Sequence, residues 1–360
     1  MNKKFFSILS VIALLLLTAC GNNEQANEKV HTEANENVLS VYTTVYPLQY
    51  FTERIGGDAV DVRSIYPPGV DEHTFDPTQK EMIALADSDI FFYIGLGLEG
   101  FIENAGKTLK GEKVIMVATA ENISEELLGD SHSHEEDGHD SHDHEEDHNS
   151  HSHEEDRHVS HDHEEDHDSH KHDDEEYDHT HSHDHGEFDP HVWISPLLSI
   201  ELATTIKDTL IKASPEKKDA FEQNYEGLKK DLLELNQKFK DMATNAPTKT
   251  FFVSHAAFGY IADTYGLEQV AVAGLNSQNE PSQKQLASLV EYAKLHGVKY
   301  VLFEQNVSSK LTDVIRKEIG AESLMLHNLG VITAEDIKNN EDYLSLMEYN
   351  IKTLAEALSN

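Results

Sequence analysis

The sequence is poor in cysteine and in basic residues, and each shortage excludes a class of structure or partner. Cys20 is the only cysteine among 360 residues, so the chain can form no internal disulfide bond. Lysine and arginine number 28 against 67 acidic residues, which gives a formal net charge of -39. A surface this acidic repels nucleic acid and anionic lipid, so we expect neither as a partner and regard cations as the natural ligands.

Long apolar runs are scarce as well. The stretch at residues 8–17 follows two lysines and is too short to cross a bilayer as a permanent helix. It leads into Leu-Thr-Ala-Cys-Gly at 17–21, which resembles the lipobox of bacterial lipoproteins. We therefore expect residues 1–19 to be a signal peptide, with Cys20 carrying a lipid that anchors the chain to the outer face of a Gram-positive cell membrane. A plain secretory peptide with a chance cysteine is the alternative.

The rest of the chain divides by composition. Residues 20–37 are polar and aperiodic, which predicts a flexible tether. From Val38 onward, short β-rich runs alternate with helical patterns such as the one over 77–86. We expect strands at 39–45, 60–65, 90–94, 114–117, 250–254, 269–273, 300–303 and 323–326. This alternation predicts an α/β fold of two (β/α) lobes with mainly parallel sheets, the first within 38–213 and the second within 247–360.

Residues 214–246 predict one long helix between the lobes. Ser214 is a suitable N-cap, Pro215 suits the first helical position, and Pro247 is the next residue that breaks helices. Apolar residues recur in steps of four and three: Phe221, Tyr225, Leu228, Leu232, Leu235, Phe239 and Met242. Such a stripe indicates either a stiff connector packed along both lobes or the seam of a coiled-coil dimer. We favour the connector, and with it a monomer.

Histidine is concentrated in one acidic segment. Residues 131–185 hold 18 of the 24 histidines in a degenerate short repeat with almost no apolar residues, which predicts a disordered loop over 130–187. Imidazoles interleaved with carboxylates suit weak, exchanging metal binding, so the loop is interpreted as an auxiliary metal collector or sensor rather than one preorganised site. A spacer without a metal role is the alternative. The histidines assigned to this auxiliary metal loop are His132, His134, His142, His144, His151, His153, His161, His163, His181, His183 and His185.

Three isolated histidines predict the principal metal site. His73 lies in the loop after the strand at 60–65, His191 lies where the acidic segment ends, and His255 follows the strand at 250–254 directly. Open α/β sheets bind ligands at the carboxyl ends of their strands, so these side chains are well placed to meet in a cleft between the lobes. Each alone would more often be a hydrogen-bonded structural histidine. Together, three neutral imidazoles favour zinc.

The motifs around these histidines resemble a known family. They read Gly-x-x-x-His-x-Phe-x-Pro at 69–77, Asp-Pro-His-Val-Trp at 189–193 and Ser-His-x-Ala-Phe-x-Tyr at 254–260. Together with the lipobox, the histidine-rich insert and the long helix, they resemble the metal-binding solute-binding proteins of ABC importers, in the zinc-uptake branch, over 38–358. The resemblance implies one ion buried between two lobes, held by His73, His191 and His255.

The fourth ligand stays open on the sequence alone. Manganese-binding relatives carry a carboxylate at the position of His255, and many zinc-binding relatives carry an acid in the loop after the last strand, where this chain has Gly330. Water, Glu72 and His327 are the candidates. Glu304, at the end of a strand in the second lobe, is expected to accept a hydrogen bond from a ligand imidazole or from local backbone amides.

These features predict a binding protein that captures extracytoplasmic Zn²⁺ and hands it to an ABC permease. Three histidines and water could also form a hydrolytic zinc site, but the sequence has no His-Glu-x-x-His helix and no nucleophile elbow, so we do not expect an enzyme. A manganese-specific binding protein would also fit these features, as would a metal-buffering lipoprotein or adhesin.

Overall fold

The computed structural model describes residues 38–129, 188–305 and 309–359. The predicted signal peptide, the tether with Cys20, and the histidine-rich segment 130–187 lie outside the described residues. Among the helices that are described, none combines the length and the apolar character needed to cross a bilayer.

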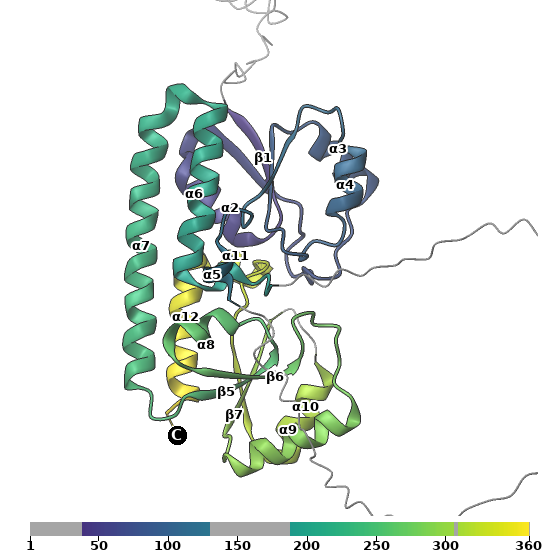
Figure 1. Cartoon of the computed structure of the whole chain (residues 1–360), viewed down its shortest axis with the longest axis vertical. Coiled ribbons are helices and arrows are strands. Elements are labelled where there is room, and N and C mark those ends of the chain that lie inside the picture. The colour runs from purple at the N-terminus through teal and green to yellow at the C-terminus, as the bar shows by residue number, and fades with distance from the viewer. Residues whose placement is uncertain (1–37, 130–187, 306–308, 360) are drawn as a thin grey trace, which may run out of the picture.

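Two sheets of four parallel strands form the two lobes, which confirms the predicted fold class (Figure 1). The first sheet has the order β2-β1-β3-β4 and the second has the order β6-β5-β7-β8. The strands are β1 Leu39–Thr43, β2 Val60–Ser64, β3 Ile90–Tyr93, β4 Ile115–Ala118, β5 Thr250–His255, β6 Glu268–Ala273, β7 Tyr300–Phe303 and β8 Glu322–Met325. In each lobe the first strand, β1 or β5, lies inside the sheet with a strand on either side.

Helices connect the strands and also build a separate layer behind both sheets. They are α2 Tyr46–Gly56, α3 Gln79–Ala86, α4 Ile102–Thr108, α5 Glu125–Leu128, α6 Pro196–Ala213, α7 Lys218–Asn245, α8 Gly259–Tyr265, α9 Gln283–Leu295, α10 Lys310–Ile319, α11 Ala334–Asn339 and α12 Tyr343–Ala357. Short 3-10 turns lie at η1 Gly57–Ala59, η2 Val192–Ile194 and η3 Pro215–Lys217. Capping boxes begin α3, α9 and α12, so the sequence marks these starts locally.

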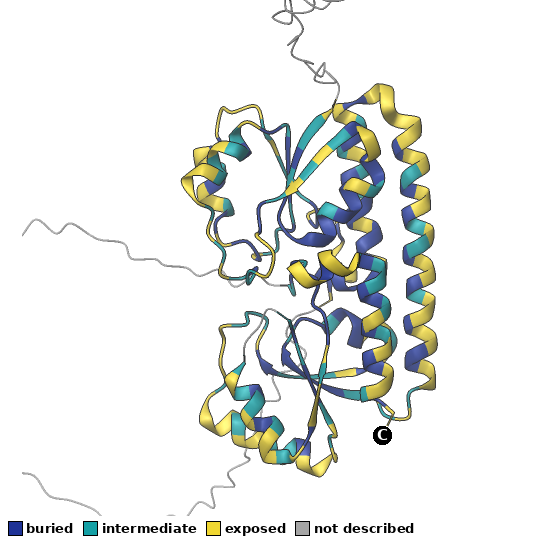
Figure 2. Ribbon diagram, turned by 180° about the vertical axis from the view of Figure 1, so that it is seen from behind, coloured by how far each residue is buried: buried dark blue, intermediate teal, exposed yellow. Residues whose placement is uncertain are grey.

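The long helix α7 is present, but it begins at Lys218 rather than at Pro215. Pro215–Lys217 forms a 3-10 turn, and Ser214 ends α6 without capping α7 through its side chain. All seven residues of the apolar stripe are buried, because α7 packs on α2, α6 and α12 of the same chain. Figure 2 shows this buried inner face along α7 and an exposed outer face. The stripe is therefore occupied within the chain and leaves no apolar seam for a coiled coil.

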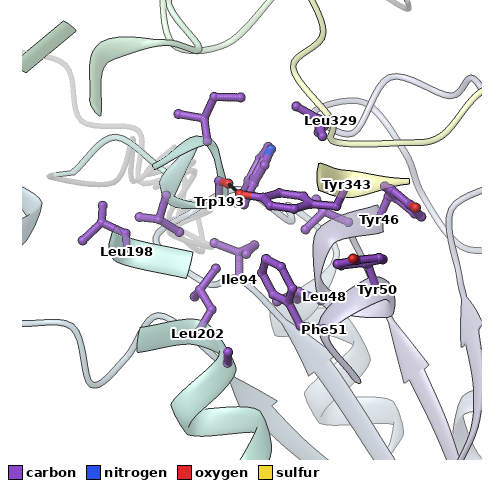
Figure 3. Packing of buried hydrophobic residues seen from close by; sticks show 14 of the residues in the cluster. Tyr46, Leu48, Tyr50, Phe51, Ile94, Trp193, Leu198, Leu202, Leu329 and Tyr343 are labelled. Atoms are coloured by element: carbon purple, nitrogen blue, oxygen red, sulfur yellow. Dashed lines mark hydrogen bonds between the residues drawn. The ribbon is translucent and has the colours of Figure 1, made fainter. Parts of the chain in front are cut away.

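One hydrophobic core contains residues of both lobes, and Figure 3 shows part of its packing. Trp193, just after the histidine-rich segment, is fully buried, and its Nε1 donates to the Asn328 carbonyl at 2.6 Å. The Tyr343 hydroxyl donates to the Trp193 carbonyl at 2.8 Å, and its ring packs edge-on against Phe51. Segments from the first part, the middle and the last part of the chain thus pack together in one core.

Candidate metal centre

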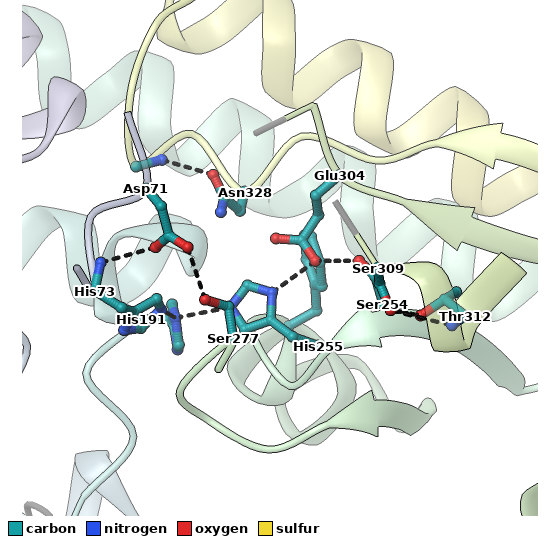
Figure 4. Close-up of polar contacts among 12 residues, drawn as sticks. Asp71, His73, His191, Ser254, His255, Ser277, Glu304, Ser309, Thr312 and Asn328 are labelled. Atoms are coloured by element: carbon teal, nitrogen blue, oxygen red, sulfur yellow. Dashed lines mark hydrogen bonds and ion pairs between the residues drawn. The ribbon is translucent and has the colours of Figure 1, made fainter. Parts of the chain in front are cut away.

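The three predicted histidines meet in the space between the lobes. His73 lies in the loop after β2, His191 immediately precedes η2, and His255 is the last residue of β5. His191 and His255 are fully buried, whereas His73 is half-buried. The ring centroids of the three side chains are 5.2 to 5.5 Å apart (Figure 4). Among the described residues, these three form the group of side chains that could hold a metal ion.

The Nε2 atoms of the three rings converge. Nε2 of His191 lies 3.2 Å from Nε2 of His73 and 3.3 Å from Nε2 of His255. A tetrahedral zinc ion with Zn–N bonds of about 2.0–2.1 Å holds two nitrogens about 3.3–3.4 Å apart. The spacing therefore matches the edge of a zinc coordination tetrahedron.

Carboxylates fix two of the rings from behind. Nδ1 of His255 lies 2.6 Å from Oε1 of Glu304, which also accepts a hydrogen bond from Ser254, and Nδ1 of His191 lies 2.7 Å from Oδ1 of Asp189. A carboxylate at Nδ1 keeps the proton on that nitrogen, which leaves the lone pair of Nε2 free for a metal. The structure thus places Glu304 at the imidazole of His255, one of the two kinds of contact expected for it.

Asp189, which contacts His191, was not among the residues singled out from the sequence, although it stands in the Asp-Pro-His motif. Its carboxylate also accepts from the backbone N–H of His191, and its carbonyl accepts from the Tyr260 hydroxyl at 2.8 Å. Tyr260 belongs to α8 of the second lobe, so this bond ties the His191 segment to the lobe that carries His255. The spacing of an acid two residues before a ligand was the available signal.

The electrostatics differ between the histidines. Burial, together with the neighbouring His191 and His255 rings, lowers the pKa of His73 to about 2, so its ring is neutral at physiological pH. Burial also opposes a charge on His255, but Glu304 beside it outweighs that effect, so the pKa of His255 is raised. The site therefore holds one ring that is always available to a metal and one that binds a proton in competition.

Glu72 contributes a buried carboxylate. It is 1% exposed, and its Oε1 accepts from Nδ2 of Asn328 at 2.9 Å. Its Oε2 has no partner within the described part of the chain, and the same is true of Oε2 of Glu304. Burial raises the pKa of Glu72 to about 7. Buried carboxylate oxygens without donors are costly, and both of these carboxylates interact electrostatically with His255.

Gly330 occupies the position at which many zinc-binding relatives carry an acid, and its surroundings leave no space for a side chain. A β-carbon at Gly330 would lie 2.5 Å from Oε1 of Glu72, so Glu72 fills the space into which a side chain at that position would project. The loop is fixed there by the Gly330 N–H, which donates to Oδ1 of Asn328, and by Leu329, which keeps a φ of 60° although this region disfavours leucine. A side chain at position 330 would therefore overlap the Glu72 carboxylate.

The structure does not bring His327 to the three histidines. Its Nε2 lies 3.3 Å from Nε2 of Gln305, its ring packs edge-on against Tyr349, and its backbone pairs with the side chain of Asn350. It follows β8, the edge strand of its sheet, whereas His255 ends the central β5. Neither Glu72 nor His327 belongs to the group of described side chains whose ligand atoms converge, although Glu72 interacts electrostatically with His255.

Comparison with known proteins agrees with this arrangement. The family described as zinc-uptake complex component A, periplasmic, matches residues 41–357. The zinc-binding lipoprotein AdcA of Streptococcus pneumoniae is 33% identical over 98% of this chain, and the high-affinity zinc uptake system protein ZnuA of Bacillus subtilis is 32% identical over 99% of both chains. The chain spans 61% of the length of the AdcA relative.

Solved structures show the same likeness. The Zn(II)-bound ZnuA-like domain of Streptococcus pneumoniae AdcA superposes with a TM-score of 0.66 at 29% identity, covering 90% of this chain and all of that domain. The metal-dependent lipoprotein YcdH of Bacillus subtilis gives a TM-score of 0.64 at 29% identity, over 89% of this chain and all of the other. With the fold, the histidine group and the family match in agreement, this chain belongs to the ZnuA family of zinc-uptake components.

Proposed function

We propose that the chain captures Zn²⁺ outside the cytoplasm and delivers it to an ABC-type permease. The observation that carries this proposal is the convergence of three imidazole Nε2 atoms, two of them 3.2 and 3.3 Å from the third. Zinc-binding and zinc-uptake relatives that match nearly the whole chain support it. The ion is cargo rather than a catalyst, since the family is one of transport components and the motifs of hydrolytic zinc enzymes are missing from the sequence.

His73, His191 and His255 are the proposed nitrogen ligands, and Glu72 is the proposed fourth. One carboxylate oxygen completes the four-coordinate shell that zinc prefers, and Oε2 of Glu72 is buried with no donor in the described residues. Binding would neutralise part of the charge of the ion and satisfy that oxygen. Glu304 and Asp189 hold two of the rings in the ligating tautomer.

The parts of the chain outside the described residues complete the proposal. Cys20 anchors the mature protein to the outer face of the membrane as a monomer, close to the permease it serves. The histidine-rich segment 130–187 acts as an auxiliary zinc collector or sensor, because its many imidazoles and carboxylates suit weak, exchanging binding of cations.

Zinc titration of matched variants tests the proposal. Deleting residues 131–186 should leave one tight zinc site per chain, whereas alanine at all three of His73, His191 and His255 should leave only weak binding at several sites. Loss of the tight site in the deletion variant, or its survival in the triple variant, would contradict the proposal.

A further inference from the structure

The Asp71 carboxylate connects the two lobes in front of the metal centre (Figure 4). Its Oδ1 accepts from the backbone N–H of His73 at 3.0 Å, which shapes the loop of the first lobe. Its Oδ2 accepts from Oγ of Ser277 at 2.9 Å and from Nε2 of Gln278 at 3.3 Å, both in the loop after β6 of the second lobe. One side chain thus holds a loop of each lobe.

The partner loop is itself attached to the histidine of the second lobe. The Gly274 carbonyl accepts from the N–H of Ala256, the residue after His255, and the Gly274 N–H donates to the carbonyl of Asn279 across the turn. The bonds from Asp71 to Ser277 and Gln278 therefore link the loop of His73 to a turn anchored beside His255.

The link lies next to the route by which an ion would reach the three histidines. His191 and His255 are fully buried, so His73 is the partly exposed ligand through which an ion would reach the centre. Asp71 lies two residues from His73 and is itself partly exposed. Its bond to Ser277 is part-buried and its bond to Gln278 is exposed, and single hydrogen bonds contribute only modestly to stability, so the link can break and re-form at little cost.

We propose that Asp71, Ser277 and Gln278 form a latch that holds the lobes together over the bound ion and slows its release. The inference rests on the proposed function, since the ion is taken to be zinc at the three histidines. Asp71 acts here as a bridge between loops and not as a metal ligand. A latch of two bonds suits a carrier, which must retain its cargo and still give it up.

The double variant Ser277→Ala/Gln278→Ala tests the latch, because it removes both bonds to the second lobe and keeps the bond from Asp71 to His73. Zinc release from the full chain into an excess of a fluorescent chelator is followed by stopped flow, and the slow phase is assigned by its absence in His255→Ala. We expect dissociation about tenfold faster than in the wild type, with association changed far less. The single variant Ser277→Thr keeps the hydroxyl, so it should release zinc as slowly as the wild type.

Ser288→Ala is the matched control, since Ser288 is an exposed serine of the same lobe whose hydroxyl bonds only within α9. Unchanged dissociation in the double variant, with zinc binding intact in the wild type, would overturn the latch alone. Equal acceleration in Ser277→Thr or Ser288→Ala would overturn it too. A wild-type chain that binds no zinc tightly would instead overturn the proposed function. Melting of the zinc-free double variant at the wild-type temperature shows that its fold is intact.

Discussion

The two lobes present their histidines to the metal centre in different ways. His255 ends a central strand and is fully buried, and its Nδ1 lies 2.6 Å from Oε1 of Glu304. His73 lies in a loop, is half-buried, and its Nδ1 makes no hydrogen bond to any described residue. One half of the site is therefore built into a sheet, whereas the other half is carried by a loop.

The largest effect is expected from removing the fixed histidine. His255→Ala should lower zinc affinity by more than about 100-fold, because loss of a ligand exceeds the 10–100-fold cost of losing an outer partner. It should also destabilise the zinc-free protein by about 1–3 kcal/mol, since Glu304 loses a buried partner. His73→Ala should weaken zinc binding to a similar extent but cause a smaller loss of stability in the zinc-free protein.

Calorimetric titration with zinc and chemical denaturation of the zinc-free chains measure both effects. His296→Ala, at an exposed histidine stacked on Tyr292, is the control and should change neither quantity. If His73→Ala and His255→Ala destabilised the zinc-free protein equally, the distinction between the histidine built into the sheet and the histidine carried by the loop would be wrong.

The pH dependence of zinc binding should come from His255 and from Glu72. Because the pKa of His255 is raised and that of Glu72 is about 7, both groups hold a proton that zinc must displace as pH falls. His73, whose pKa is lowered to about 2, stays neutral throughout. Affinity measured by competition with a chelator should fall on the order of 100-fold between pH 7.5 and 5.5. Equal affinity at the two values would argue against ligation by His255 and Glu72.

Removing the support of His255 should have an intermediate effect. Glu304→Gln keeps the size of the side chain but removes its charge, so zinc affinity should fall about 10-fold to 100-fold. The pKa of His255 should fall as well, because Glu304 is what raises it, and the pH dependence should shift to lower pH. Zinc titration across pH values measures both changes, with Glu318→Gln at an exposed glutamate as the control. An unchanged pH profile would show that Glu304 does not set the charge of His255.

The smallest of these effects is expected at Glu72, whose place water can take. Glu72→Ala should weaken zinc binding about tenfold, a loss at the low end of the range for groups around a metal. The double variant Glu72→Ala/Gly330→Asp should regain affinity, because the space left by Glu72 is where a side chain at 330 projects. Gly330→Asp alone should destabilise the chain, since its β-carbon would meet Glu72 at 2.5 Å. Thermal melting and zinc titration of the three variants decide this, and failure of the double variant to bind better than Glu72→Ala would refute the exchange.

Local patterns sufficed to predict the sheets and the three histidines. Alternation of strands and helices predicts parallel sheets, and the carboxyl end of a strand such as β5 is marked by an apolar run followed by Ser254 and His255. The predicted start of α7 was wrong because Pro215 suits a 3-10 turn as well as the first turn of an α-helix.

What the sequence could not supply was the order of strands and the contacts between distant loops. His255 and His327 both follow strands, but β5 is central and β8 is an edge, which no local pattern reveals. The partner of Asp71 lies 206 residues further along the chain. The overlap of Glu72 with the space at Gly330 likewise depends on how the lobes meet.

Anomalous diffraction at the zinc edge, from crystals of the full chain grown with zinc, would identify the ion and its ligands together. We expect one strong peak between the lobes, about 2.0–2.1 Å from Nε2 of His73, His191 and His255. Strong peaks only elsewhere, or none at these three nitrogens, would contradict it.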